Sequence, residues 1–540
     1  MTEPQPVPSS ASSSIARSAG AMGAATFLSR IAGLVREQAF AFWFGAGIWM
    51  DAFKVAYGIP NLLRDLFAEG AMSSAFVPTF NAVLQKDGKE GAFRLARLVL
   101  STLLVIVGFL TVVGILLAPV IVSLLAGDFK QVPEKYDATV TMTRIMFPFL
   151  LEVSWAAVVM GMLNSFGSFF TPAIAPVFLN LAMIAAGFVL CPLAVSLGWP
   201  AIIGMAVGAM LGGFLQFLVQ IPPLWKMGFR PGWSWNLADS GLRRIMNLMV
   251  PGTIGMAATQ INVVVSTFLA TSQGTGAVSW LGYAFRLMQL PLGLFGVAIA
   301  QATLPVVSRQ AADGNLVEMK KTLAESLRLT AFINLTASLA LMACAEPLIR
   351  ILFEHGRFTP DDTLATAGAL RAYAAGLLFF SIIKVMGPSF YALGDTAAPV
   401  RASLASVAAN VLLNLALIGP FGYWGLALGA SLASALNAGM LFWGMRRHLG
   451  SWSETGLFAA IWKTLVCGVI SSLVMWKSLA LIPAWLAAPV GGKLVRVLID
   501  LSSLTLAGLL GGLVLFLSAR LLGIPEVEKA VALIRRKLRV

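Results

Sequence analysis

Apolar segments long enough to cross a lipid bilayer recur along the whole chain, and they constrain its fold more than any other feature of the sequence. A transmembrane helix needs roughly 20 predominantly apolar residues, and about fourteen such segments can be drawn. Mean hydropathy is +0.85 and 11% of the 540 residues are charged, whereas soluble domains have about a quarter. The sequence therefore predicts an all-α polytopic membrane protein without a large soluble domain.

The predicted spans define the expected domains. To within a few residues, they cover 19–44, 51–84, 93–125, 137–165, 172–196, 200–226, 244–271, 279–309, 316–345, 362–394, 398–418, 422–447, 457–482 and 493–522. We expect residues 1–18 to form a disordered cytoplasmic tail, because they lack the basic n-region and short apolar h-region of a signal peptide. The parts expected after this tail are an N-lobe of six spans (19–226), a cytoplasmic linker (227–243), a C-lobe of six spans (244–447), two extra spans (457–522) and a basic cytoplasmic tail (523–540).

Lysine and arginine cluster in every second connection between the spans. The clusters are Lys86, Lys89, Arg94 and Arg97; Lys226, Arg230, Arg243 and Arg244; Arg309, Lys320 and Lys321; Arg446 and Arg447; and Arg535, Arg536, Lys537 and Arg539. By the positive-inside rule, the clustered side and both termini are cytoplasmic. This topology accounts for the formal net charge of +14. No aromatic residues are interleaved with the basic ones, so we do not expect nucleic acid as a partner.

Two parts of the chain repeat one frame, in which an arginine opens a span and a proline 28 residues later starts the next. Its fixed points in the first and second copy are Arg144 and Arg371, Gly167 and Gly394, and Pro172 and Pro399. Six spans separate the copies, and an even number preserves orientation. We therefore predict two six-helix lobes related by a parallel pseudo-two-fold repeat, as in transporters whose substrate path lies between the halves.

Charged residues inside the spans are the main candidates for a functional site, since each charge at mid-bilayer costs roughly 2.5 to 3.5 kcal/mol. At about 1.5 Å per residue, Arg30 lies roughly 16 Å into the first span and Arg36 roughly 25 Å. The second span runs back, so Asp51 is expected at the level of Arg36 and Arg64 at that of Arg30. We predict that these four residues line one aqueous cavity, with Arg36 and Asp51 paired at its outer end.

Arginine inside the membrane suggests recognition of phosphate, because its guanidinium stays charged and binds phosphate oxygens in a bidentate fork. Arg30, Arg64 and Arg286 converging in one cavity would make a site for a diphosphate. The nearest carboxylates for the first two are Asp65 and Glu69. The alternative is that each arginine closes an interhelical salt bridge or extends to an interface. We favour that alternative for three cations near span ends, Lys54, Arg144 and Arg371.

The remaining polar residues in the spans suggest weaker hypotheses. Asn410 and Asn414 share one helical face and form a possible small-cation site, although a helix–helix hydrogen bond is the simpler interpretation. Lys384 is a candidate tethered charge in place of a coupling cation. Further polar candidates are Glu152, Arg144 and Arg371. The residues interpreted as packing or solvated groups are Cys191, Cys344, Cys467, His355, His448, Asp361 and Asp362, which give no metal-ligand or catalytic spacing.

Four segments resemble one protein family closely. They are SRIAGLVRE, DAFKVAYGIPNLLRDLFAEGAMSSAFVPTF, YAFRLMQLPLGLFGVAIAQATLP and KVMGPSFYALGDTAAPV. On these segments the chain is identified as a member of the MurJ (MviN) family of bacterial lipid II flippases, with a likeness from about Ser18 to the twelfth span. The resemblance implies the fold of the multidrug/oligosaccharidyl-lipid/polysaccharide exporters, with two lobes around a cationic cavity and a hydrophobic groove formed by spans 13 and 14.

The resemblance also assigns residues. The family's substrate-binding arginines fall on Arg30, Arg36, Arg64 and Arg286, and its functional acids on Asp51 and Glu69. Many members have Asp beside the first-helix arginine, where this chain has Glu37. Some have an acid just before the later arginine, where this chain has Phe285. Glu37, Asp51, Glu69 and Lys384 are therefore the expected supporting or gating charges.

The implied function is transport of lipid II, an undecaprenyl-diphosphate-linked disaccharide-pentapeptide, from the cytoplasmic to the periplasmic leaflet by alternating access. It would serve peptidoglycan synthesis, cell-wall biogenesis and cell shape in the bacterial inner membrane. We expect no enzymatic activity, metal or cofactor, but dependence on membrane potential or a coupling ion remains open, as do contacts with other cell-wall synthesis proteins. The alternatives are a flippase for another polyprenyl-diphosphate-linked glycan and a cation-coupled multidrug antiporter of the same fold.

Overall fold

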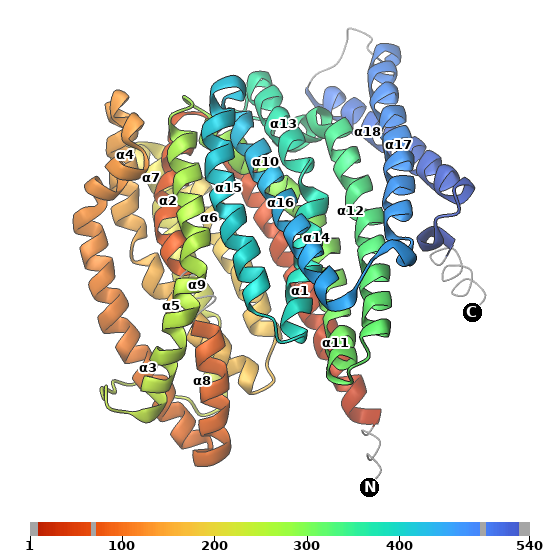
Figure 1. Cartoon of the computed structure of the whole chain (residues 1–540). Helices are drawn as coiled ribbons and strands as arrows, with labels where there is room; N and C mark the ends of the chain where they lie inside the picture. Colours follow the sequence, from red (N-terminus) through yellow and green to blue (C-terminus); the bar gives the residue numbers. More distant parts are fainter. Residues whose placement is uncertain (1–8, 66–71, 487–492, 529–540) are drawn as a thin grey trace. The chain divides into compact units, whose positions relative to one another are not determined.

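The computed structural model describes residues 9–65, 72–486 and 493–528, and all regular elements in these ranges are helical. The α-helices are α1 (Ser9–Phe44), α2 (Ile48–Arg64), α3 (Ser73–Leu125), α4 (Pro133–Met146), α5 (Phe149–Ser165), α6 (Phe170–Ser196), α7 (Ala201–Leu218), α8 (Ile221–Lys226), α9 (Ser240–Thr271), α10 (Ala277–Pro291), α11 (Val297–Ala312), α12 (Leu316–Phe353), α13 (Pro360–Ala374), α14 (Leu377–Ala392), α15 (Ala397–Phe421), α16 (Tyr423–Leu449), α17 (Leu457–Leu486) and α18 (Lys493–Leu521). Figure 1 shows their arrangement.

The predicted transmembrane character is confirmed. Among the described residues, 10 helices are long and apolar enough to cross a membrane, or up to 11 if the bent pair α13 and α14 forms one span. The other predicted spans, 19–44, 51–84 and 244–271, fall on α1, on α2 with the start of α3, and on α9. Because α1 carries Arg30, Arg36 and Glu37, its mean hydropathy is lower than that of a purely apolar span.

The helix α1 begins at Ser9, within the tail that the sequence predicted to be disordered. Residues 9–18 contain no proline or glycine, and other residues cost at most about 0.7 kcal/mol each in a helix relative to alanine. Once the apolar span has nucleated a helix, extending it toward the N-terminus adds one hydrogen bond per residue. The prediction of disorder was therefore wrong for residues 9–18, while residues 1–8 lie outside the described ranges.

The chain divides into two compact units, Met1–Thr275 and Gly276–Val540. In the first unit, α7 packs closely on α6, since a Cβ at Gly204 would lie 2.4 Å from the carbonyl oxygen of Leu190. In the second, α16 packs on α15 in the same way, with Gly425 against the backbone of Leu417. Such small residues let membrane helices approach at the backbone. The division places α9 in the first unit, whereas the sequence assigned it to the C-lobe, and the predicted domain boundaries stay a prediction.

The repeated frame is present in the backbone of both units at an offset of 227 residues. Gly167 and Gly394 have φ of 77° and 76°, values that favour glycine because it has no Cβ to clash. The same backbone hydrogen bond closes the turn around each glycine. The Ser168 amide donates to the Leu163 carbonyl at 2.9 Å, and the Asp395 amide donates to the Phe390 carbonyl at 3.0 Å. In each unit this turn joins a broken helix pair to the next span, α6 or α15.

The helices α17 and α18 lie side by side and pack against α12 (Figure 1). Close contacts join them, because a Cβ at Gly468 would lie 2.7 Å from the Leu339 side chain of α12 and one at Gly511 would lie 2.3 Å from Met475 of α17. The two extra spans thus form a helix pair that packs on α12. Their expected role in holding a lipid tail stays a prediction.

Candidate functional site

Arg36 and Glu37 form a buried ion pair on α1. A guanidinium nitrogen of Arg36 lies 2.5 Å from a carboxylate oxygen of Glu37, and their side chains are 7% and 8% exposed. The guanidinium also lies 5.4 Å from the centre of the Phe40 ring and 3.8 Å from the sulfur of Met183 on α6. The predicted supporting charge Glu37 therefore lies beside the arginine that it was expected to accompany.

Asp51, the predicted partner of Arg36, forms an ion pair with Lys135, a residue that the sequence analysis did not single out, and its pairing with Arg36 stays a prediction. The Lys135 ammonium on α4 lies 3.0 Å from the Asp51 carboxylate on α2, with side-chain exposures of 4% and 0%. The ammonium also lies 3.9 Å from the centre of the Phe129 ring, within reach of a cation–π interaction. Counting residues along a helix gives the depth of a side chain but not the face to which it points. It therefore could not identify Lys135 as a partner of Asp51.

Lys135 was missed because it lies in GDFKQVPEKYD, between the predicted spans 93–125 and 137–165. The structure begins α4 at Pro133, a favoured first helical residue, and this buries Lys135 in the first turn. Pro-Glu-Lys, a typical helix start, was the available signal in the sequence. It indicated a helix start but not the buried carboxylate.

Arg30 and Arg64 are the two predicted phosphate-binding residues of the first unit. Arg64 ends α2 and directs Nε and Nη2 to one oxygen of Asp65, at 3.1 and 2.8 Å. This confirms Asp65 as a partner, with side chains 23% and 38% exposed; Glu69 lies outside the described residues. Arg30 is half-buried on α1, and within the described part of the chain no carboxylate is paired with it.

Arg286 and Lys384 are the corresponding candidates of the second unit, and both side chains are exposed. Arg286 lies on α10 within the apolar stretch Ala277–Ala312, just before a π-helical turn, Leu292–Gly296; such turns are frequent at functional sites. Phe285 packs edge-on against the Tyr373 ring at 5.3 Å, so the position before Arg286 serves packing. The predicted convergence of arginines from both units in one cavity stays a prediction.

Asn410 and Asn414 are buried on α15 and hydrogen-bond each other along the helix. The Asn414 amide nitrogen donates to the Asn410 side-chain oxygen at 3.0 Å. A Cβ at Gly429 of α16 would lie 2.4 Å from the Asn414 side-chain oxygen, so the amide fits against a glycine of the neighbouring helix. Their proposed role as a cation site stays a prediction.

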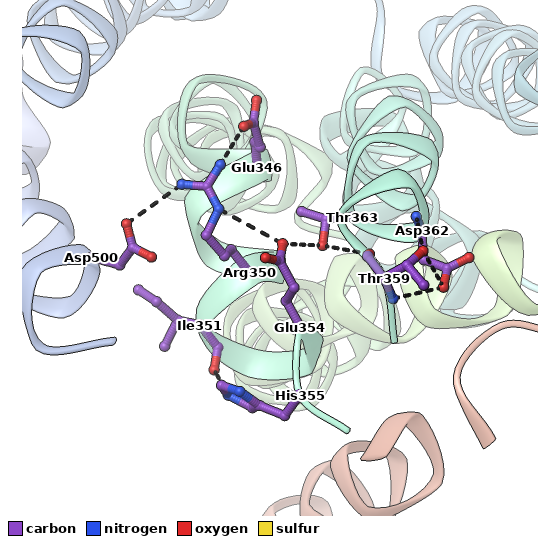
Figure 2. Close-up of polar contacts among 9 residues, drawn as sticks. All are labelled: Glu346, Arg350, Ile351, Glu354, His355, Thr359, Asp362, Thr363 and Asp500. Carbon is purple, nitrogen blue, oxygen red and sulfur yellow. Dashed lines mark hydrogen bonds and ion pairs between the residues drawn. The ribbon is translucent and has the colours of Figure 1, made fainter. Parts of the chain in front are cut away.

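A second charged cluster surrounds Arg350 at the end of α12 (Figure 2). Its guanidinium contacts Glu346 at 2.6 Å, Glu354 at 3.8 Å and Asp500 of α18 at 3.5 Å. Glu354 also accepts a hydrogen bond from Thr363 at 2.7 Å. In the first half of α12, Arg328 contacts Glu526, which follows α18 in the chain, at 3.4 Å. No part of this cluster was predicted from the sequence. Asp500 links α18 to the end of α12, and Glu526 links the segment after α18 to Arg328.

Residues assigned to packing or solvated roles fit those assignments in part. Cys191, Cys344 and Cys467 are buried free thiols, as predicted. Asp362 is not simply solvated, because it completes a capping box with Thr359 at the start of α13. It also accepts a hydrogen bond from the Trp280 indole at 2.8 Å. In the described ranges, no three His, Cys, Asp or Glu side chains are placed to hold a metal ion.

Helices of bilayer-spanning length, a repeated broken span and cationic side chains within the spans define a polytopic membrane transporter. The family model described as "Lipid II flippase MurJ" matches residues 40–489. This chain therefore belongs to the MurJ family of lipid II flippases.

Relatives and solved structures agree with this assignment. A probable lipid II flippase MurJ from Vibrio cholerae is 35% identical over 507 residues, covering 91% of this chain and 92% of the relative. The lipid II flippase MurJ from Burkholderia cenocepacia is 37% identical over 427 residues, covering 78% and 82%. A solved structure titled "Lipid II flippase MurJ, inward closed conformation" has a TM-score of 0.75 at 26% identity, covering 93% of this chain and 98% of that one.

The fold extends beyond the flippases. An inward-facing multidrug resistance MATE family transporter of the MOP superfamily matches with a TM-score of 0.62 at 16% identity, covering 78% of this chain and 96% of that one. At this identity the likeness concerns the fold alone. The predicted all-α polytopic fold is therefore confirmed, and it is shared with these transporters.

Proposed function

We propose that this protein moves lipid II from the cytoplasmic to the periplasmic leaflet of the bacterial inner membrane by alternating access. Family membership carries the substrate assignment. The product would supply peptidoglycan synthesis. Basic clusters between the spans support cytoplasmic termini by the positive-inside rule.

Arg30, Arg64 and Arg286 are each proposed to bind the diphosphate of the substrate during transport. The observation that carries this role is the position of Arg286, which is exposed on α10 within an apolar stretch. Because a guanidinium is costly in hydrocarbon, an exposed one within a span is best accommodated in water or against an anion. A guanidinium binds phosphate through a charge-assisted bidentate fork, and this is the contact proposed for Arg286 in the substrate-bound state.

The buried charges are proposed to shape this site rather than to bind the phosphates directly. Arg36 is already engaged by Glu37 within α1, and the Lys135–Asp51 pair joins α4 to α2. Lys384 is exposed on α14 and remains a candidate for a tethered charge. Transport itself requires no covalent step, since the substrate leaves the protein chemically unchanged.

The test is to replace Arg30, Arg64 or Arg286 with alanine and measure how much lipid II headgroup becomes accessible at the outer leaflet. Loss of a charged hydrogen-bonding partner costs about 1.5 to 3 kcal/mol, so we expect transport to fall about 10- to 100-fold. Lysine at these positions should restore part of it, because charge returns without the fork. Arg144→Ala is the matched control, since Arg144 is an exposed arginine near the end of α4. Normal transport at normal expression would remove the substituted arginine from the proposed role.

A further inference from the structure

Glu152 on α5 is an acidic side chain without a counter-charge inside a membrane span. It lies in the apolar stretch Pro133–Ser165, 13 residues or about 20 Å from its end. One carboxylate oxygen is fully buried and has no hydrogen-bond partner. A Cβ at Gly213 of α7 would lie 2.5 Å from this oxygen, so the carboxyl group occupies space that the glycine leaves open.

The neighbouring helices do not supply a cation to Glu152. In α7 there is no ionisable side chain, and in α6 there is only the Cys191 thiol. The charged groups of α3 lie between Lys86 and Arg97, α8 has Lys226, and α2 has Asp51, Lys54 and Arg64 besides the phenol of Tyr57. Across the described part of the chain, none of these groups forms an ion pair or hydrogen bond with Glu152.

An ionised carboxylate in this position would lose its hydration without gaining a donor, which is a large cost in an apolar environment. Binding a proton removes that cost. The side chain as a whole is only partly buried, and proton exchange would proceed through its second oxygen. We propose that Glu152 is a proton-binding site, protonated when α5 packs on α7 as observed and deprotonated when the carboxyl group becomes hydrated during the transport cycle.

The repeated frame shows that this site belongs to one unit. At the offset of 227 residues, the counterpart of Glu152 is Phe379 on α14, a side chain that needs no proton. A protonatable group in one copy and an apolar group in the other would confine this proton-binding site to the first unit. The part of the proposal that concerns transport rests on the proposed flippase function, whereas proton binding does not.

Infrared spectroscopy of the purified protein in lipid vesicles tests proton binding without any transport assay. At neutral pH, the Glu152→Gln variant should lack a carboxylic-acid C=O stretch that the wild-type protein has. The difference spectrum between the two should show this loss. Glu134→Gln is the matched control, because Glu134 is exposed in the first turn of α4 and should lose a carboxylate band instead. Loss of a carboxylate band from Glu152→Gln would overturn the proposal. If that variant fails to fold, a pH titration of the wild-type spectrum replaces it, and absence of a titrating carboxylic-acid band has the same meaning.

Flipping measured over a range of pH tests coupling. Glutamine mimics the protonated side chain. The Glu152→Gln variant should therefore flip at every pH with the rate that the wild type has at acidic pH, so its rate should no longer depend on pH. A wild-type pH profile in this variant would overturn the coupling. Wild-type protein that does not flip lipid II at any pH would instead contradict the proposed function, while the infrared result would still stand.

Discussion

One charged cluster in each unit shows how burial changes the way in which opposite charges are matched. In the first unit, the Lys135 ammonium lies 3.0 Å from the Asp51 carboxylate, and the two side chains are 4% and 0% exposed. In the second, the 39% exposed side chain of Arg350 contacts three carboxylates. A buried charge must be matched closely because burying it without a partner costs several kcal/mol. At an exposed helix end, water solvates the carboxylates that exceed the number of cations. A cluster with more acidic than basic groups is therefore tolerated there.

The largest effect is expected from breaking the buried pair. Lys135→Met removes the ammonium beside Asp51 and should lower the free energy of unfolding by about 3 to 5 kcal/mol. Thermal unfolding in detergent measures this loss. Adding Asp51→Asn should recover most of it, because the buried carboxylate is then also gone. A double variant as unstable as the single one would mean that Lys135 acts through packing on Phe129 rather than through charge.

A smaller effect is expected in the exposed cluster. Arg350→Gln should lower the free energy of unfolding by at most about 1 kcal/mol, the usual range for exposed ion pairs. Asp500→Asn should cost less, since Arg350 keeps Glu346 and Glu354. Added salt should shrink both differences, because it screens exposed charges. A loss as large as that of Lys135→Met, unaffected by salt, would break the contrast between the two regions.

The smallest effect concerns Asp395, in the turn between α14 and α15. Hydrogen bonds from the Ala398 amide and from His448 hold the pKa of Asp395 below its usual value. A lowered folded-state pKa stabilises the turn above the unfolded pKa, and this stabilisation is lost as the pH falls through the folded pKa. Asp395→Asn should therefore speed hydrogen exchange of the Ala398 amide near neutral pH but not in strong acid. Equal acceleration at both pH values would mean that the carboxylate charge is irrelevant.

Most of the architecture could be predicted because bilayer thickness fixes the length of an apolar helix. The repeated frame was readable for a related reason, since Gly167 and Gly394 occupy a turn with positive φ that favours glycine. The start of α1 at Ser9 was not predicted, because a polar, serine-containing segment gives no hydropathy signal when it merely continues a helix.

The sequence by itself determined the transmembrane class, the repeat and the arginines that lie within spans, because these depend on local hydropathy and spacing. Only the tertiary structure decided the partners. Lys135 meets Asp51 across 84 positions of sequence, and Asp500 reaches Arg350 across 150. Residue counting fixes the depth of a side chain, whereas helix rotation and packing decide which opposite charge it meets. For Glu152 the structure decided that the space beside Gly213 holds a carboxyl group and no cation.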